Sequence, residues 1–196
     1  MVDPDVIRVT SSLDPPDLAT LPWYGVDHTL PASRFIPGLP PPREPRQTAA
    51  VHGPWTPKQW PTLQPYLRGA DLFNRWYFWE AHEEWECLWR AHPPQSAPAR
   101  YIQGLIAAAA SLLKLRIGQL RSARTLSTAA CERLAVFRGI WMGLEVERFR
   151  ADLTRCLARP DTASPAVLGP ETPRICLETP RSSGAGPAAK NRKPGG

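Results

Sequence analysis

Two side chains near the middle of the chain are spaced for shared chemistry. His82 and Glu86 stand four residues apart in the segment 78–92, FWEAHEEWECLWRAH. In an α-helix this spacing places both groups on one face, a single turn apart. A helical wheel also places Trp79 and Trp89 on either side of the pair, at the edge of the apolar face. An imidazole and a carboxylate at the edge of an aromatic core need partners, because burying them unpaired is costly.

Three chemical interpretations of this pair stay open on the sequence alone. The first is structural: a His82–Glu86 hydrogen bond, extended by an ion pair from Glu86 to Arg90, fastens two helices together, and the geometry favours it. The second is a divalent metal ion held by His82, Glu86 and Glu83, since imidazole and carboxylate groups are common metal ligands. The third is acid–base chemistry, with Glu83 or Glu86 as the general base.

Complete catalytic motifs are missing from the sequence, so the catalytic residues are unknown and whether the protein is an enzyme stays open. The run HEEWE at 82–86 lacks the second histidine of the HExxH zinc-protease motif. No glycine-rich phosphate loop or nucleophile arrangement accompanies it. The sequence therefore predicts a small binding domain whose possible cofactor is a divalent metal ion.

The following helix supplies an opposing face. Gln103, Ala107, Ala110 and Lys114 recur on one line of that helix, and the alanines let tryptophans of a partner helix approach closely. Gln103 and Lys114 lie about 16 Å apart along the helix axis, so each can reach a different part of the first helix. With the two tryptophans, Trp79 and Trp89, they are the candidate cofactor-binding residues. An ion pair between Lys114 and Glu86 is the simplest role for the lysine.

The elements that position these residues are all helical. A short helix is predicted from Tyr66, followed by a turn near 74–76, because the apolar residues recur with helical spacing. Proline and glycine then separate four further helices, predicted over 78–92, 99–117, 119–138 and 144–159. No strand-like alternation stands out. The expected fold is an all-α bundle of four to five helices, with Glu80 and Glu84 of the first long helix facing solvent.

Proline divides the chain into three parts. Of its 24 prolines in 196 residues, 14 lie in residues 1–66 and seven at or after position 160. We therefore expect a helical domain over 66–159 between a proline-rich N-terminal arm, 1–65, and a disordered basic tail, 160–196. The arm contains LPPPREP, a polyproline II candidate at 39–45. It also holds several aromatic residues, so we expect it to pack partly on the domain.

Composition limits the partners and the compartment. The net charge is +6, and the helices after position 100 and the tail AAKNRKPGG are basic. This makes a weak case for an interaction protein that binds nucleic acid or an acidic protein, with a structural His82–Glu86 pair. Four cysteines without a CxxC pair, no apolar run long enough for a membrane and no visible signal peptide favour a cytoplasmic location. An oligomer is possible. Arginine, alanine and proline enrichment is typical of a GC-rich bacterial genome.

The two long central segments resemble a family called domain of unknown function 309, which occurs in bacteria and archaea. The resemblance rests on FNRWYFWEAHEEWECLWR at 73–90, with its HxxxExx(W/Y) motif, and on RYIQGLIAAAASLLKLRIGQLRSA at 100–123. RFIPGLPPP at 34–42 is similar to a lead-in found in part of that family. The resemblance implies an all-helical fold and a suspected metal-binding motif without an established activity. Trp76 stands where glycine is common in the family, and Lys114 stands where histidine is common.

Overall fold

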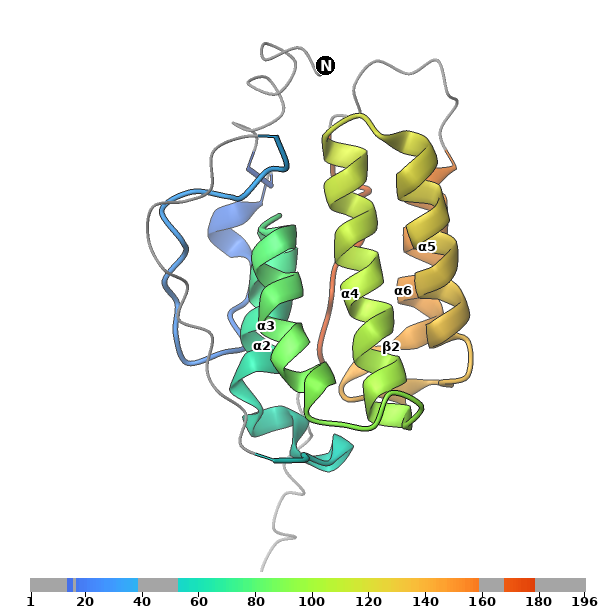
Figure 1. Cartoon of the computed structure of the whole chain (residues 1–196). Helices are drawn as coiled ribbons and strands as arrows, with labels where there is room; N and C mark the ends of the chain where they lie inside the picture. Colours follow the sequence, from blue (N-terminus) through green and yellow to red (C-terminus); the bar gives the residue numbers. More distant parts are fainter. Residues whose placement is uncertain (1–13, 16, 39–52, 159–167, 179–196) are drawn as a thin grey trace, which may run out of the picture.

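The computed structural model describes residues 14, 15, 17–38, 53–158 and 168–178. The predicted all-α class is confirmed: the helices run alternately up and down beside one another (Figure 1). The described residues contain five α-helices and two short 3-10 helices. Their bounds are α2 (Gln64–Asn74), α3 (Phe78–Arg90), α4 (Ala97–Arg116), α5 (Leu120–Leu134), α6 (Val146–Leu157), η1 (Leu18–Thr20) and η2 (Pro57–Thr62).

Helix α4 shows how the sequence sets the helix ends. Its N-cap is Ser96, whose hydroxyl oxygen accepts a hydrogen bond from the Ala99 N–H at 3.4 Å. Pro98 lies in the first turn, where a missing N–H costs nothing, so the helix begins two residues before the predicted position 99. Gly118 follows its end with φ of +75°, a backbone conformation that glycine adopts without strain.

A short β-hairpin joins α5 to α6, in a part of the chain where no strand-like alternation stands out in the sequence. Strands β1 (Ile140–Trp141) and β2 (Leu144–Glu145) pair antiparallel. Met142 and Gly143 between them both have positive φ, at 48° and 78°, as a two-residue type I′ turn requires. Strands of two residues are too short to show alternating polarity in a sequence.

One tryptophan fixes the approach of α2 to α3. Trp85 is completely buried, and its indole N–H donates to the Tyr66 carbonyl at 3.3 Å. A Cβ at Gly69 on α2 would lie 2.1 Å from the Trp85 indole nitrogen. The glycine therefore lets the two helices approach closely enough to enclose the ring.

The C-terminal end of α2 anchors the N-terminal arm. Asp71 is fully buried and its carboxylate accepts the N–H groups of Tyr24 and Gly25, each at 2.8 Å. Arg75 is also buried and donates to the Leu21 carbonyl at 2.9 Å. Its guanidinium lies 3.5 Å from the centre of the Trp23 ring. Two buried charged residues, one in the last turn of α2 and one directly after it, thus hold residues 21–25 against the bundle.

Residues 168–178 of the expected C-terminal tail are folded onto the bundle, so the prediction of a disordered tail over 160–196 does not hold for these residues. Residues 168–178 are extended beside the helices (Figure 1) and bury Leu168, Ile175 and Leu177. These aliphatic side chains join the apolar core, which explains why the segment packs. The basic end of the tail, 179–196, and the polyproline candidate at 39–45 lie outside the described residues.

The turn between α2 and α3 explains why glycine suits the position that Trp76 occupies in this chain. Trp76 has φ of +63°, in the left-handed region that glycine occupies freely. Its side chain is nevertheless buried in the core. The family resemblance places glycine at this position, and the conformation is the one that favours glycine.

Candidate functional site

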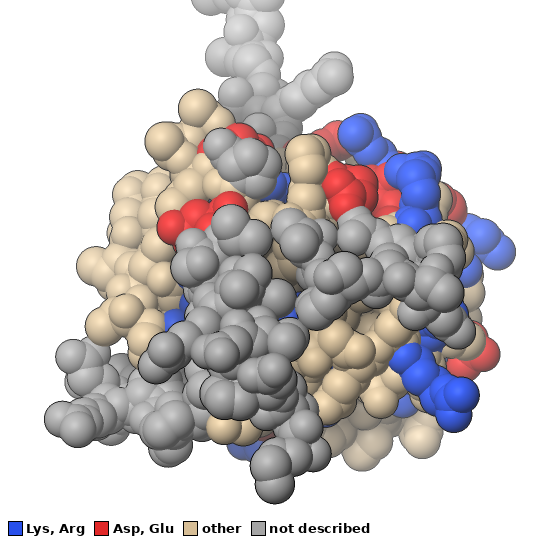
Figure 2. Space-filling view, turned by 90° about the horizontal axis from the view of Figure 1, so that it is seen from above, with Lys and Arg blue, Asp and Glu red and all other residues tan. Residues whose placement is uncertain are grey.

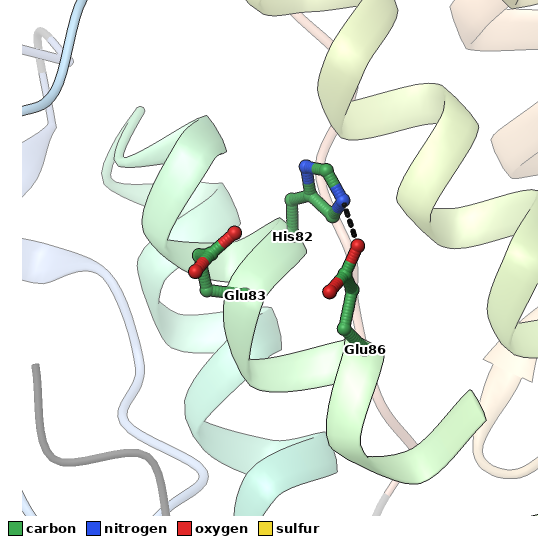
Figure 3. Close-up of side chains that lie close together, drawn as sticks. All are labelled: His82, Glu83 and Glu86. Atoms are coloured by element: carbon green, nitrogen blue, oxygen red, sulfur yellow. Dashed lines mark hydrogen bonds and ion pairs between the residues drawn. The ribbon is translucent and has the colours of Figure 1, made fainter. Parts of the chain in front are cut away.

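The His82–Glu86 pair forms as its spacing predicts. The imidazole Nε2 of His82 lies 3.0 Å from Oε1 of Glu86, and the two groups point toward one another from successive turns of α3 (Figure 3). The other oxygen of Glu86 accepts a hydrogen bond from Arg90, which is the predicted ion pair one turn later. The side chains of His82 and Glu86 are 20% and 23% exposed, so solvent reaches them from one side.

The aromatic neighbour of His82 links the pair to the N-terminal arm. The Trp79 and His82 rings meet edge to face, with centroids 5.2 Å apart. Phe35 of the arm packs on Trp79, with centroids 4.7 Å apart, and its N–H donates to the Glu80 carboxylate at 2.8 Å. The arm therefore contacts the tryptophan that packs against the imidazole. The aromatic residues of the arm predicted that it packs partly on the domain, but no repeated pattern joins positions 35 and 79, so this particular contact could not be predicted.

Glu83 completes a group of three possible metal ligands. One donor atom from each of His82, Glu83 and Glu86 lies within 4.8 Å of the other two, and all three residues are half-buried. Figure 3 shows Glu83 on the flank of the helix beside the pair. Two ligands of a small octahedral ion are about 3.0 Å apart when adjacent and about 4.2 Å apart when opposite, so these three donor atoms lie near the separations that one ion requires. In the described parts of the chain this is the one such group.

The opposing face on α4 lies beside α3, but its polar residues have other contacts. Gln103 accepts a hydrogen bond from Arg133 of α5 at 3.5 Å. Within the described ranges no hydrogen bond or ion pair of Lys114 is found, and Glu86 pairs with Arg90 instead. Trp89 is half-buried with its indole nitrogen shielded from solvent and without an acceptor among the described residues. The ligand-binding role of these residues and of Trp79 stays a prediction.

The His82–Glu86 pair lies within the part of the chain that matches a known protein family. Residues 66–126 match the family described as Domain of unknown function (DUF309). The DUF309 domain of this chain is thus residues 66–126. The match spans α2, α3, α4 and about half of α5, and so contains the three possible ligands. Searches of the curated proteins and of the solved structures found no match to the chain.

Two acidic residues on the other side of α3 are buried, which corrects the prediction that they face solvent. In the DUF309 domain, Glu80 is 4% and Glu84 7% exposed. The arm covers Glu80, and Arg68 of α2 lies 3.4 Å from Oε1 of Glu84. Burial raises the pKa of Glu84 to about 7, although the Arg68 charge opposes this rise. The helical wheel misplaced both residues because it contains no information about the segments that cover them.

The surface of the helical bundle mixes charges of both signs. Seen from above, Lys and Arg gather on the side of α5 and α6, with Asp and Glu among them (Figure 2). Arg155 on α6, for example, is paired with Asp152 at 2.7 Å. Among the described helices, none combines the length and the apolar character required to cross a bilayer.

Proposed function

We propose that the DUF309 domain of this protein binds a divalent metal ion through His82, Glu83 and Glu86. The observation that carries the proposal is the donor set itself: one imidazole and two carboxylates on a half-buried face, with their donor atoms within 4.8 Å. Carboxylates are common on protein surfaces. A histidine that packs against an aromatic ring beside two carboxylates is a more specific indication of a metal site.

The distance between His82 and Glu86 suits a shared ion. Adjacent ligands of an octahedral ion at about 2.1 Å are roughly 3.0 Å apart, and those of tetrahedral zinc are a few tenths of an ångström further apart. The observed Nε2–Oε1 separation is 3.0 Å. An ion that replaces the shared proton therefore needs little movement of either side chain.

The charges around the site favour a cation but not strongly. Two carboxylates supply negative charge, and Arg90 offsets part of it by pairing with Glu86. The Arg90 side chain is 68% exposed and can turn into solvent when an ion binds. This arrangement predicts moderate affinity for a divalent ion, with Zn²⁺ and Mn²⁺ as the appropriate probes.

Titration calorimetry of the tag-free full chain with Zn²⁺ and Mn²⁺ tests the proposal. We expect one ion per chain, and at least about tenfold weaker binding in His82→Ala and in Glu86→Gln, because each change removes a ligand. Glu132→Gln, at an exposed carboxylate of α5, is the matched control and should bind like the wild type. Equal affinity in all four proteins, or no binding at millimolar metal, would contradict the proposal.

Arg90→Gln should raise the metal affinity, whereas the substitutions of the ligands lower it. Removing a positive charge that pairs with a ligand is expected to strengthen metal binding by about fivefold, from the Coulomb energy of nearby exposed charges. Arg155→Gln is the control, since Arg155 is similarly exposed and pairs with a carboxylate of its own helix, away from the site. Calorimetry at low ionic strength measures both. Weaker binding in Arg90→Gln would mean that the arginine positions the ligands instead.

A second candidate is a non-catalytic interaction protein in which the His82–Glu86 pair is structural. The observation in its favour is that both oxygens of Glu86 already have protein partners. The basic side of α5 and α6 would then carry the function by meeting an acidic protein or nucleic acid. In that case His82→Ala lowers thermal stability and leaves metal uptake unchanged, and binding to the acidic partner weakens steeply with salt.

A further inference from the structure

The C-terminal segment 168–178 lies on the bundle as an added strand. Leu177 forms an antiparallel bridge with Leu144 of the β-hairpin. The next N–H, of Glu178, donates to the Gly143 carbonyl at 2.8 Å, and the Leu177 N–H donates to the Tyr24 hydroxyl at 3.2 Å. These contacts use the main chain of the segment, so they do not depend on its side chains.

Asn74 at the end of α2 recognises the same main chain. Its side-chain amide donates to the Ile175 carbonyl and its side-chain oxygen accepts the Ile175 N–H, both at 2.8 Å. Asn74 is only 2% exposed, so without the segment both groups of its amide would lose these partners. The Asn74 amide thus pairs with both main-chain polar groups of one residue, Ile175, as a neighbouring strand would.

Side chains of the segment add selectivity at alternate positions. Ile175 and Leu177 are buried, and Cys176 between them faces solvent. Arg174 donates to the Asn74 carbonyl at 2.5 Å and to the Asp17 carboxylate at 2.6 Å. The groove therefore reads an arginine followed by apolar side chains at the next position and two residues beyond it.

We propose that this groove is a peptide-recognition site and that residues 168–178 are its resident ligand. Its receptor groups are held by helix α2 and the β-hairpin, and the occupant has no helix of its own. A cavity of about 490 Å³ lies between α6 and the segment, so the outer side of the segment is not sealed. The fitting partner is an extended peptide of another protein with the pattern arginine, apolar, any residue, apolar. This site is independent of the proposed metal site.

The test uses the full chain with a protease site introduced within 159–167 and cut after folding. The probe is a labelled peptide of residues 170–180 with Cys176→Ser. Fluorescence anisotropy measures its binding. We expect saturable binding to the cut chain and at least about tenfold weaker binding to the uncut chain, whose tethered segment competes at high effective concentration. A peptide methylated at the Ile175 nitrogen, which cannot donate to Asn74, should bind at least about tenfold more weakly, as should an Ile175→Asp peptide.

Several results would overturn the proposal. They are no exchange of the labelled peptide into the cut chain, equal binding of the methylated and unmethylated peptides, and unfolding of the chain on cutting. The last result, read by circular dichroism, would make the segment an integral part of the core. Concentration-dependent dimers of the uncut chain that Ile175→Asp abolishes would assign the groove to a second copy instead of to another protein.

Discussion

Asp71→Ala is expected to destabilise the domain by about 3–5 kcal/mol, the typical cost of breaking a buried charge pair. The change leaves the N–H groups of Tyr24 and Gly25 without their acceptor. It also removes the carboxylate that lies 3.7 Å from the buried Arg75 guanidinium. Burial raises the pKa of Asp71, and the two N–H donors oppose this rise, so its stabilising role depends on these partners.

Urea denaturation of the full chain measures this loss, and hydrogen exchange shows where it acts. The amides of Tyr24 and Gly25 should lose protection more than those of α4. Asp152→Ala is the matched control, because Asp152 pairs with exposed arginines and should cost about 1 kcal/mol or less. An Asp71→Ala protein as stable as the control would show that the arm does not depend on this anchor.

Glu84→Gln is expected to remove a pH dependence of stability. The folded pKa of Glu84, about 7, lies above the ordinary 4.5, so the folded state binds the proton more tightly than the unfolded state. Stability from this group is therefore present at low pH and lost as the pH rises through 4.5 to 7. Relative to the variant, the wild type should lose about 2 kcal/mol between pH 5 and pH 8.

Denaturation of both proteins at the two pH values gives this difference directly, since other titrating groups are common to both. Arg68 keeps its ion pair with Asp27 at 2.9 Å in the variant, so its own environment changes little. Glu132→Gln, at an exposed position, should leave the pH dependence as it is in the wild type. A constant difference between wild type and Glu84→Gln at pH 5 and pH 8 would mean that Glu84 titrates normally.

The helices were predictable because local rules determine them. Periodic apolar residues, together with proline and glycine at the ends, predicted helices over 78–92 and 99–117. The structure has them at Phe78–Arg90 and Ala97–Arg116. The packed segment 168–178 was missed because main-chain hydrogen bonds and Asn74 hold it. Asn74, a polar residue among the apolar ones at the end of α2, and the apolar residues Ile175 and Leu177 were the sequence features that bear on this contact.

The site was predictable to the extent that one helix forms it. The i,i+4 rule gave the His82–Glu86 hydrogen bond and the Glu86–Arg90 pair, both of which are present. It could not give the support that Phe35 provides to Trp79, or the burial of Glu84, because both depend on distant segments. The expected pairing of Lys114 with Glu86 is absent among the described contacts, and Arg90, one turn away on the same helix, pairs with this carboxylate instead.

The most direct test of the metal proposal is nitrogen NMR of the imidazole of His82 in tag-free protein titrated with Zn²⁺. If the ion binds as proposed, the Nε2 resonance of His82 shifts to the position of a metal-bound nitrogen at one equivalent, and the other three histidines stay unchanged. Glu86→Gln should require at least about tenfold more Zn²⁺ for the same shift. An Nε2 resonance that does not move at saturating Zn²⁺ would contradict the account and leave the pair as a structural hydrogen bond.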